Sequence, residues 1–248
     1  MSQFYNPKRS RNWNYGGAKW KLSRSKIDLF LECPRCFYLD NKLGLKRVPG
    51  FPFALNSAVD FLLKQEFDTH RVQGTKHPLQ EEYGIDAVPA QHPNIDTWRE
   101  NFEGVTCIHH DTGLTVSGAI DDLWMTSSGE YIVVDYKATA KEAPVTDLDQ
   151  AWHDGYKRQM EVYQWLLRHN DLAVSDTGYF VYCTGKMDRH AFDKVIEFDV
   201  VLISYTGKDD WVDSTLHDVK TCLESDTIPA ASPDCDHCTY WYARKDIE

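Results

Sequence analysis

The 248-residue sequence contains no apolar run of about 20 residues, the length that a helix needs to cross a bilayer. Its opening stretch, MSQFYNPKRSRNWNYGG, also lacks the apolar centre of a signal peptide. No internal repeat and no recognisable linker is present. These absences predict a protein without a membrane span or a secretory signal, and therefore a cytoplasmic location.

Positive charge is in deficit: 27 Lys and Arg stand against 38 Asp and Glu, a net charge of −11. This balance argues against a passive nucleic-acid coat, which would be basic. The deficit is uneven, because residues 1–47 carry eleven basic and three acidic residues, or +8, which leaves −19 for the remainder. A basic segment beside an acidic body suits a protein that holds an anion and also binds cations.

The chain has seven cysteines, and a reducing compartment makes a disulfide framework an unfavourable interpretation. Four of them form two C-x-x-C pairs, Cys33 with Cys36 and Cys235 with Cys238. A C-x-x-C turn aims both sulfurs at one point, so two pairs predict a four-thiolate cage for Zn²⁺ or an iron–sulfur cluster. The alternative is that all seven are free thiols.

Residues 1–22 are rich in Asn, Gly, Lys and Arg and predict a flexible basic arm, whereas 23–248 predict a single domain. Apolar residues at helical spacing indicate helices on both sides of a β-rich centre. Pro34 is expected to break the first of them. The predicted helices cover 22–45, 54–71, 147–170 and 209–225.

From Val105 onward the sequence becomes β-rich, with turn residues between the runs. The first three runs predict a meander, and two further strands follow the long helix at 147–170. Strands combined with flanking helices give an α/β fold with a mixed central sheet covered by helices. The predicted strands cover 105–111, 114–126, 130–139, 178–185 and 195–205.

Two charges in the run YIVVDYKAT need an explanation. Positions two apart on a strand face the same way, so Asp135 and Lys137 share a face. If the preceding strand pairs with this one, Asp121 comes close to Asp135, and two carboxylates on one face need a cation. Oxygen ligands suit Mg²⁺ or Mn²⁺, and Lys137 would then serve the attacking water or a phosphoryl oxygen. The plain alternative is an ion pair at a sheet edge.

The stretches GAIDDLW, EYIVVDYKAT and QMEVY together resemble the core motifs of the PD-(D/E)XK nuclease superfamily. The closest resemblance is to its RecB-like branch, which includes CRISPR-associated iron–sulfur nucleases and RecB/AddB-type nuclease domains. The opening LSRSKIDLFLECPRCFYLDNKLGL also resembles that branch. The resemblance implies a restriction-endonuclease-like core, with Asp121, Asp135 and Lys137 at the site. It also implies that Gln159 and Tyr163, which share a helix face, look onto that site.

The same resemblance implies a metal-dependent DNA exonuclease of repair, recombination or foreign-DNA processing, with a helicase or other repair partner. In the family a helix before the sheet often supplies a further metal ligand, for which Asp60 and Glu66 are the candidates here. The related iron–sulfur clusters use one N-terminal and three C-terminal cysteines. Since no cysteine follows Cys238, Cys36 or Cys222 would complete this cage.

The basic N-terminal residues are predicted to bind the phosphate backbone of single- or double-stranded DNA. Two other functions fit less well: a non-cleaving nucleic-acid-binding module with a structural Cys₄ metal site, and a hydrolase of small phosphorylated molecules. The complete Asp121, Asp135 and Lys137 set argues against the first, and the aromatic, basic N-terminal third argues against the second. The predicted backbone contacts are Arg35, Lys42, Lys46 and Arg47.

Overall fold

The computed structural model describes residues 6, 8–50 and 54–248, which form two compact units that alternate along the chain. Of the described residues, the first unit comprises 6, 8–50, 107–117 and 210–248, and the second comprises 54–106 and 118–209. The predicted boundary between an arm at 1–22 and one domain at 23–248 stays a prediction. No helix in the described ranges is long and apolar enough to span a bilayer.

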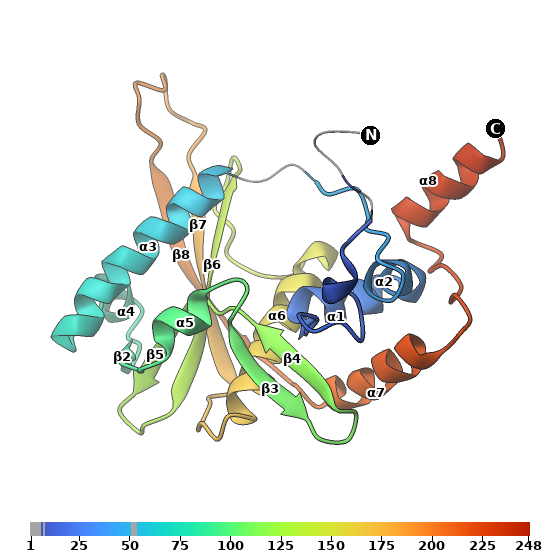
Figure 1. The fold of residues 1–248 in the computed structure, drawn as a ribbon. Coiled ribbons are helices and arrows are strands. Elements are labelled where there is room, and N and C mark those ends of the chain that lie inside the picture. The colour runs from blue at the N-terminus through green and yellow to red at the C-terminus, as the bar shows by residue number, and fades with distance from the viewer. Residues whose placement is uncertain (1–5, 7, 51–53) are drawn as a thin grey trace. The chain divides into compact units, whose positions relative to one another are not determined.

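The second unit is built on a five-stranded mixed sheet with the order β2-β5-β6-β7-β8 (Figure 1). Only the central pair, β6 and β7, is parallel; the other neighbours are antiparallel. The mixed sheet flanked by helices confirms the predicted α/β fold class. The strands are β2 (Ala87–Pro89), β5 (Asp122–Thr126), β6 (Tyr131–Ala140), β7 (Thr177–Gly185) and β8 (Phe198–Thr206).

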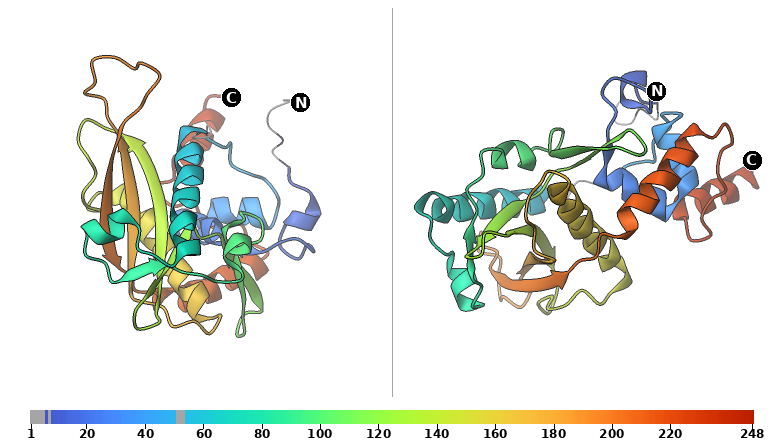
Figure 2. Two further views of the ribbon diagram at one scale, coloured as in Figure 1. Left: turned by 90° about the vertical axis from the view of Figure 1, so that its left-hand side faces the viewer. Right: turned by 90° about the horizontal axis from the view of Figure 1, so that it is seen from below.

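Two long helices of this unit cover opposite faces of the sheet (Figure 2). On the α3 side, Phe67 stacks on Trp124 and Tyr136 with ring centroids 5.6 and 5.8 Å apart. On the α6 side, a Cβ added to Gly178 of β7 would lie only 2.9 Å from Met160 Cε of α6, so glycine allows the close approach. The helices are α3 (Ala54–Gln73), α4 (Pro78–Glu82), α5 (Ile95–Arg99) and α6 (Asp154–Arg168), which follows the short 3₁₀ helix η2 (Ala151–His153).

The first unit combines helices with a small sheet of order β1-β4-β3. Pro34 occupies the first turn of α2, so it separates α1 from α2 as predicted. The described part of the predicted arm is hydrogen-bonded near the end of α2, including Tyr15 N–H to Asn41 O at 2.7 Å. The elements are η1 (Arg11–Trp13), β1 (Leu22–Ser23), α1 (Arg24–Glu32), α2 (Pro34–Asn41), β3 (Val105–His109), β4 (Leu114–Gly118), α7 (Trp211–Glu224) and α8 (Asp236–Lys245).

The predicted meander is wrong at its second run, 114–126. The chain leaves β4 at Gly118 and starts β5 at Asp122, and the two strands belong to different sheets. Between them Ile120 is fully buried and donates its backbone N–H to Trp98 O at 3.1 Å, outside any strand ladder. The break matters because it places Asp121 immediately before β5.

Candidate active site and cysteine cluster

The two charges of β6 form an ion pair on the face of the sheet covered by α6. The Asp135 carboxylate is completely buried, and Lys137 Nζ contacts its Oδ2. Lys137 Nζ also lies 4.5 Å from the centroid of the Tyr156 ring and 5.9 Å from that of Phe180. Buried charges of this kind persist only when they are paired. The strand alternation predicted from the sequence has therefore placed the carboxylate and the ammonium on one face, where they pair with each other.

Gln159 of α6 ties this pair together. Its Nε2 donates to Asp135 Oδ1 at 2.6 Å, and its Oε1 accepts from Lys137 Nζ at 3.2 Å. Tyr163, one helical turn further, accepts from the same Nε2 at 3.0 Å. Both α6 residues are buried, at 8 and 4% exposure. The structure therefore brings together four of the residues predicted for the site, from one strand and one helix.

Asp121 is fixed beside Asp135 by the backbone of β6. Its Oδ2 accepts the Tyr136 N–H at 2.9 Å, and its Oδ1 lies 3.6 Å from Lys64 Nζ. The side chain keeps 23% exposure, so it can be approached from solvent. The predicted proximity of the two carboxylates thus arises from the loop between β4 and β5, not from ladder pairing.

Of the two candidate residues on α3, the structure brings Asp60 towards Asp121 and turns Glu66 away. Asp60 accepts from Lys64 Nζ at 2.9 Å, whereas Glu66 Oε1 lies 2.9 Å from His77 Nε2. Partial burial and the neighbouring negative charge of Asp121 raise the pKa of Asp60, against the opposing effect of Lys64. Asp60 therefore takes up a proton at a higher pH than an isolated aspartate.

The donor atoms at this place fit a hard divalent cation, because carboxylate oxygens are what Mg²⁺ and Mn²⁺ take. Within the described ranges, however, the carboxylates of Asp60, Asp121 and Asp135 do not all lie within 4.8 Å of one another. The ammonium groups of Lys64 and Lys137 instead balance the negative charge of these three carboxylates, Lys64 beside Asp60 and Asp121 and Lys137 beside Asp135. Lys64 is not among the site residues predicted from the sequence. Its i, i+4 spacing from Asp60 is the sequence feature that could have indicated it.

The neighbouring Asp122 faces the opposite side of the sheet and has a different role. It is completely buried and bonded to Arg71, to Arg99 at 2.9 Å and to the Tyr136 hydroxyl at 2.7 Å. Burial and this carboxylate raise the pKa of Tyr136 well above its usual value. Asp122 begins β5, whereas Asp121 lies in the loop before it. The two arginine partners of Asp122 come from α3 and α5, and the sequence did not predict them.

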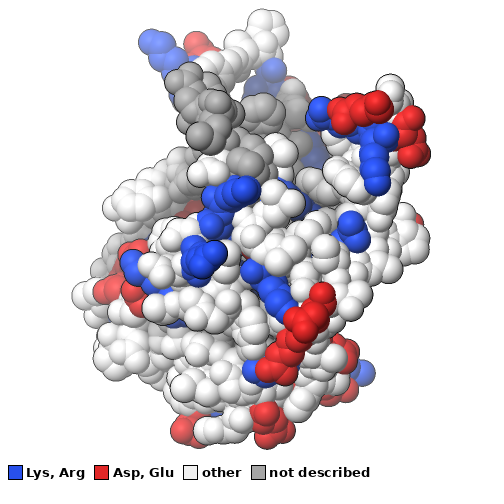
Figure 3. Space-filling model, turned by 45° about the vertical axis from the view of Figure 1, so that its right-hand side comes forward, with Lys and Arg blue, Asp and Glu red and all other residues white. Residues whose placement is uncertain are grey.

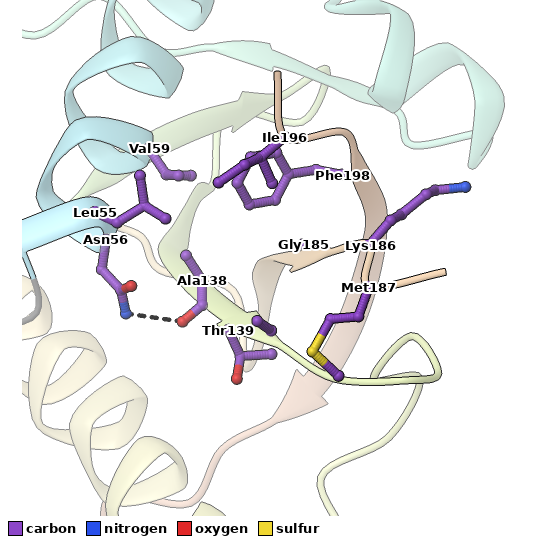
Figure 4. A pocket seen from close by; sticks show the side chains of 11 residues that line it. Leu55, Asn56, Val59, Ala138, Thr139, Gly185, Lys186, Met187, Ile196 and Phe198 are labelled. Carbon is purple, nitrogen blue, oxygen red and sulfur yellow. Dashed lines mark hydrogen bonds between the residues drawn. The ribbon is translucent and has the colours of Figure 1, made fainter. Parts of the chain in front are cut away.

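An apolar cavity of about 360 Å³ lies at the end of β6 that follows Lys137 (Figure 4). Leu55 and Val59 of α3 line one side, and Ile196 and Phe198 line another. Asn56 Nδ2 donates to Ala138 O at 2.8 Å and holds α3 against the strand there. The residues of β6 that directly follow the charged pair thus line the cavity.

The four paired cysteines meet in the first unit, as predicted. Their sulfurs all lie within 4.8 Å of one another, with separations of 3.9 Å for Cys33–Cys238, 3.6 Å for Cys36–Cys235 and 3.5 Å for Cys36–Cys238. Four sulfurs about 2.3 Å from one tetrahedral ion are about 3.8 Å apart, so these separations fit a single ion. Cys222 is not part of this group.

Each C-x-x-C pair begins a helix, which favours thiolates there. Cys33 and Cys235 are the N-cap residues of α2 and α8. Burial opposes ionisation of Cys33, but backbone hydrogen bonds from Ser232 and Cys36 outweigh it and lower its pKa to about 6. Arg47 donates to Cys235 Sγ at 3.4 Å. By contrast, burial raises the pKa of Cys107 to about 12, as expected for a packed thiol.

The predicted DNA-binding basic residues make contacts within the first unit. Arg47 pairs with Glu32 at 2.9 Å besides contacting the cysteines, and Lys42 lies 3.7 Å from Asp226. Arg35 donates to Pro229 O at 3.3 Å. On the face drawn in Figure 3, Lys and Arg are interspersed with uncharged and acidic residues. Binding of nucleic acid by these side chains and by Lys46 stays a prediction.

Comparison with known proteins gives one informative match. The family model of the PD-(D/E)XK nuclease superfamily matches residues 54–243. A search of the curated proteins found no match. Among solved structures, one described as "Crystal structure of SSO0001" is similar over 89% of this chain and 81% of that chain, with 13% identity and a TM-score of 0.39. We draw nothing from so distant a likeness, and the RecB-like branch stays a prediction.

Proposed function

Because the chain belongs to the PD-(D/E)XK nuclease superfamily, we propose that it is a metal-dependent nuclease that hydrolyses phosphodiester bonds, with DNA as the substrate. The observation that carries this proposal is Gln159, which bridges the Asp135 carboxylate and the Lys137 ammonium inside a buried site. Such a bridge orients a metal-binding carboxylate and a proton-handling amine toward the same reacting group. An isolated ion pair at a sheet edge would not need it.

Asp121 and Asp135 would hold Mg²⁺ or Mn²⁺, with Asp60 as the nearest further oxygen donor. The bound ion would neutralise phosphate charge and lower the pKa of a water. Lys137 stays close to Asp135 and would place its ammonium against a phosphoryl oxygen or the attacking water. Gln159 and Tyr163 are positioning residues, because they fix the orientation of Asp135 and Lys137 through hydrogen bonds.

The finer parts of the proposed function follow from the cavity, the sequence motifs and the basic residues. The apolar cavity after Lys137 would suit a base next to the cleaved phosphate. The RecB-like motifs favour a role in repair, recombination or foreign-DNA processing, with a helicase or other repair partner. The basic residues of 1–47, among them Arg35, Lys42, Lys46 and Arg47, would steer the backbone.

The direct test is cleavage of labelled single- and double-stranded DNA and RNA with Mg²⁺ or Mn²⁺, using protein purified anaerobically. Lys137→Ala and Asp135→Ala are each expected to lower the rate about 10²–10⁴-fold, the range for loss of a proton-transferring or charge-stabilising group. Lys157→Ala, which removes an exposed lysine of α6 paired with Asp154, is the matched control and should cleave normally. Product sizes then distinguish exonuclease from endonuclease action.

Equal cleavage by the wild type and both variants would refute the assignment. Tight binding of nucleic acid without any cleavage would support the alternative function, a non-cleaving binding module. In that case the cysteine cage would be the only working metal site among those predicted from the sequence.

Lys64 provides a second test of the same site. Its ammonium neutralises Asp60 and Asp121 where the proposed metal would bind, so the two cations compete. Lys64→Met is therefore expected to tighten Mn²⁺ binding about two- to fivefold, the worth of a partly exposed ion pair. Mn²⁺ titration followed by electron paramagnetic resonance measures this, with Lys157→Met as control. Unchanged or weaker binding would show that Lys64 does not compete with the metal.

For the cysteine cage we propose a single tetrahedral Zn²⁺ with a structural role. In an iron–sulfur cluster the cysteines ligate different irons, so their sulfurs lie further apart than sulfurs that share one ion. The measured separations of 3.5 to 3.9 Å support the shared ion. An iron–sulfur cluster stays the alternative, and elemental analysis of anaerobically prepared protein decides between iron and zinc.

A further inference from the structure

A group of histidines and aspartates lies in the first unit, apart from the four cysteines. His109 ends β3, Asp111 lies in the turn that follows, and His217 comes from α7. One ligand atom from each of these three residues lies within 4.8 Å of the others. Asp213, one turn before His217 on α7, approaches His109 to 3.7 Å. We propose that these four side chains form a second metal site, for a divalent transition ion such as Zn²⁺.

The orientation of His109 is that of a metal ligand. A hydrogen bond of 2.9 Å joins its Nδ1 to the Thr112 hydroxyl, which is itself bonded to the Leu114 N–H at 3.3 Å. That leaves Nε2 directed at α7, where it meets Asp213. Metal-binding histidines characteristically engage their second nitrogen in this way, which fixes the ring. His109 is also 8% exposed, so its position is set by packing before any ion arrives.

The distances are close to those of a tetrahedral site. His217 Nε2 lies 3.8 Å from Asp111 Oδ2, and His109 Nε2 lies 3.7 Å from Asp213 Oδ1. Ligand atoms at 2.0–2.1 Å from Zn²⁺ are about 3.3–3.4 Å apart, so these two pairs need to close by about 0.3–0.5 Å. Asp111 and His217 have side-chain exposures of 73 and 54%, so they can make this adjustment.

Two ordinary histidine–aspartate ion pairs are the alternative explanation. Exposed pairs of that kind contribute little, and they do not require both histidines to approach each other. Here the two rings meet edge to face with centroids 5.5 Å apart, and each approaches an aspartate, His109 towards Asp213 and His217 towards Asp111. Two imidazoles and two carboxylates converging from a hairpin and a helix are a donor set that Zn²⁺ uses. Such an ion would link α7 to the β3–β4 turn within the first unit, and the inference does not depend on nuclease activity.

Calorimetric titration of the full chain with Zn²⁺ tests the site. The cysteine cage is kept loaded as purified, and excess Mg²⁺ covers the carboxylate site. The wild type should bind one more Zn²⁺ per chain than His217→Ala. Asp111→Asn should weaken that binding at least tenfold. The matched controls are His190→Ala and Asp218→Asn, which alter an exposed histidine elsewhere and an exposed aspartate of α7. Both should bind like the wild type.

Co²⁺ gives a second readout, because ligation by nitrogen and oxygen lacks the intense charge-transfer absorption of a cobalt–thiolate site. The Co²⁺ spectrum should show only the weaker bands, and these should be lost in His217→Ala but kept in Asp218→Asn. Thr112→Val tests the orientation of His109 and should weaken binding while the protein stays folded by circular dichroism. Equal stoichiometry and affinity in the wild type, His217→Ala and Asp111→Asn would overturn the proposal.

Discussion

Asp121→Asn is expected to affect activity and Asp122→Asn to affect stability, although the two residues are neighbours. The first should lower the cleavage rate about 10³-fold and leave stability nearly unchanged, whereas the second should lower the free energy of unfolding by about 3–5 kcal/mol. The difference follows from the faces they occupy. Asp121 borders the proposed metal site, while Asp122 is buried on the other face among cations.

The cost at Asp122 comes from the partners left behind. Its carboxylate is completely buried and accepts from Arg71, Arg99 and the Tyr136 hydroxyl. An amide keeps the shape but removes the charge, so two buried guanidinium groups lose a counter-ion. Asp68 still pairs with both arginines, but its side chain is 41% exposed and screens them less effectively. Urea unfolding of the loaded protein measures the loss.

The fold tolerates Asp121→Asn because the amide oxygen can still accept the Tyr136 N–H. The substitution also removes a negative charge that raises the pKa of Asp60, so it relieves repulsion. What it removes is charge on the proposed metal ligand. A loss of about 4 kcal/mol of transition-state stabilisation corresponds to about 10³-fold in rate. Single-turnover cleavage at saturating metal measures this.

The two readouts check each other. Asp121→Glu keeps the charge but moves it, and should retain more activity than Asp121→Asn if charge at this position matters. A large loss of stability in Asp121→Asn, or an Asp122→Asn variant as stable as the wild type, would contradict the division of roles between the two faces.

Local periodicity explains why part of the site was predictable. A period of two places Asp135 and Lys137 on one face of β6, and a period near four places Gln159 and Tyr163 on one face of α6. Each pair is therefore set by its own element, whatever surrounds it. The paired C-x-x-C turns are local in the same sense, and they needed only the chain to bring α2 and α8 together.

Contacts between elements were not predictable in this way. Lys64 reaches Asp121 only because α3 lies against the sheet, and Arg71 and Arg99 converge on Asp122 from two helices. The sequence did not predict the break at Gly118, because 114–126 is one uninterrupted β-rich run. At the break, the Tyr163 ring occupies the space that a side chain at Gly118 would need. The short elements α4, β2 and α5 lie in 72–103, a stretch that none of the predicted helices and strands covers.

Removal of a cysteine ligand is expected to release the C-terminal helix. Of the residues of α8, all of which the structure describes, only Cys238 is buried. Apolar burial therefore contributes little to holding α8, which otherwise has Arg35 lying 6.0 Å from the Trp241 and Tyr242 rings. We expect the loaded thiolate cage to be what fixes it. Structural Zn²⁺ contributes apparent binding free energies of about 10–16 kcal/mol in small domains, far more than a few exposed contacts. Cys235→Ser should thus leave residues 236–245 exchanging amide hydrogens as fast as an unfolded peptide.

Hydrogen exchange followed by mass spectrometry measures this, with Cys222→Ser as the matched control because Cys222 lies outside the cage. The Cys33→Ser variant is the more informative half of the experiment, since Cys33 and Cys36 begin α2. Tyr38 of α2 is 3% exposed and Phe37 is completely buried, so packing holds α2 even without the ion. Cys33→Ser should therefore release α8 while α2 stays protected.

If α8 stayed protected in both variants, or if a chelator changed nothing, the cage would not be what holds it. Equal loss of protection in α2 and α8 would instead indicate that the ion organises the first unit as a whole.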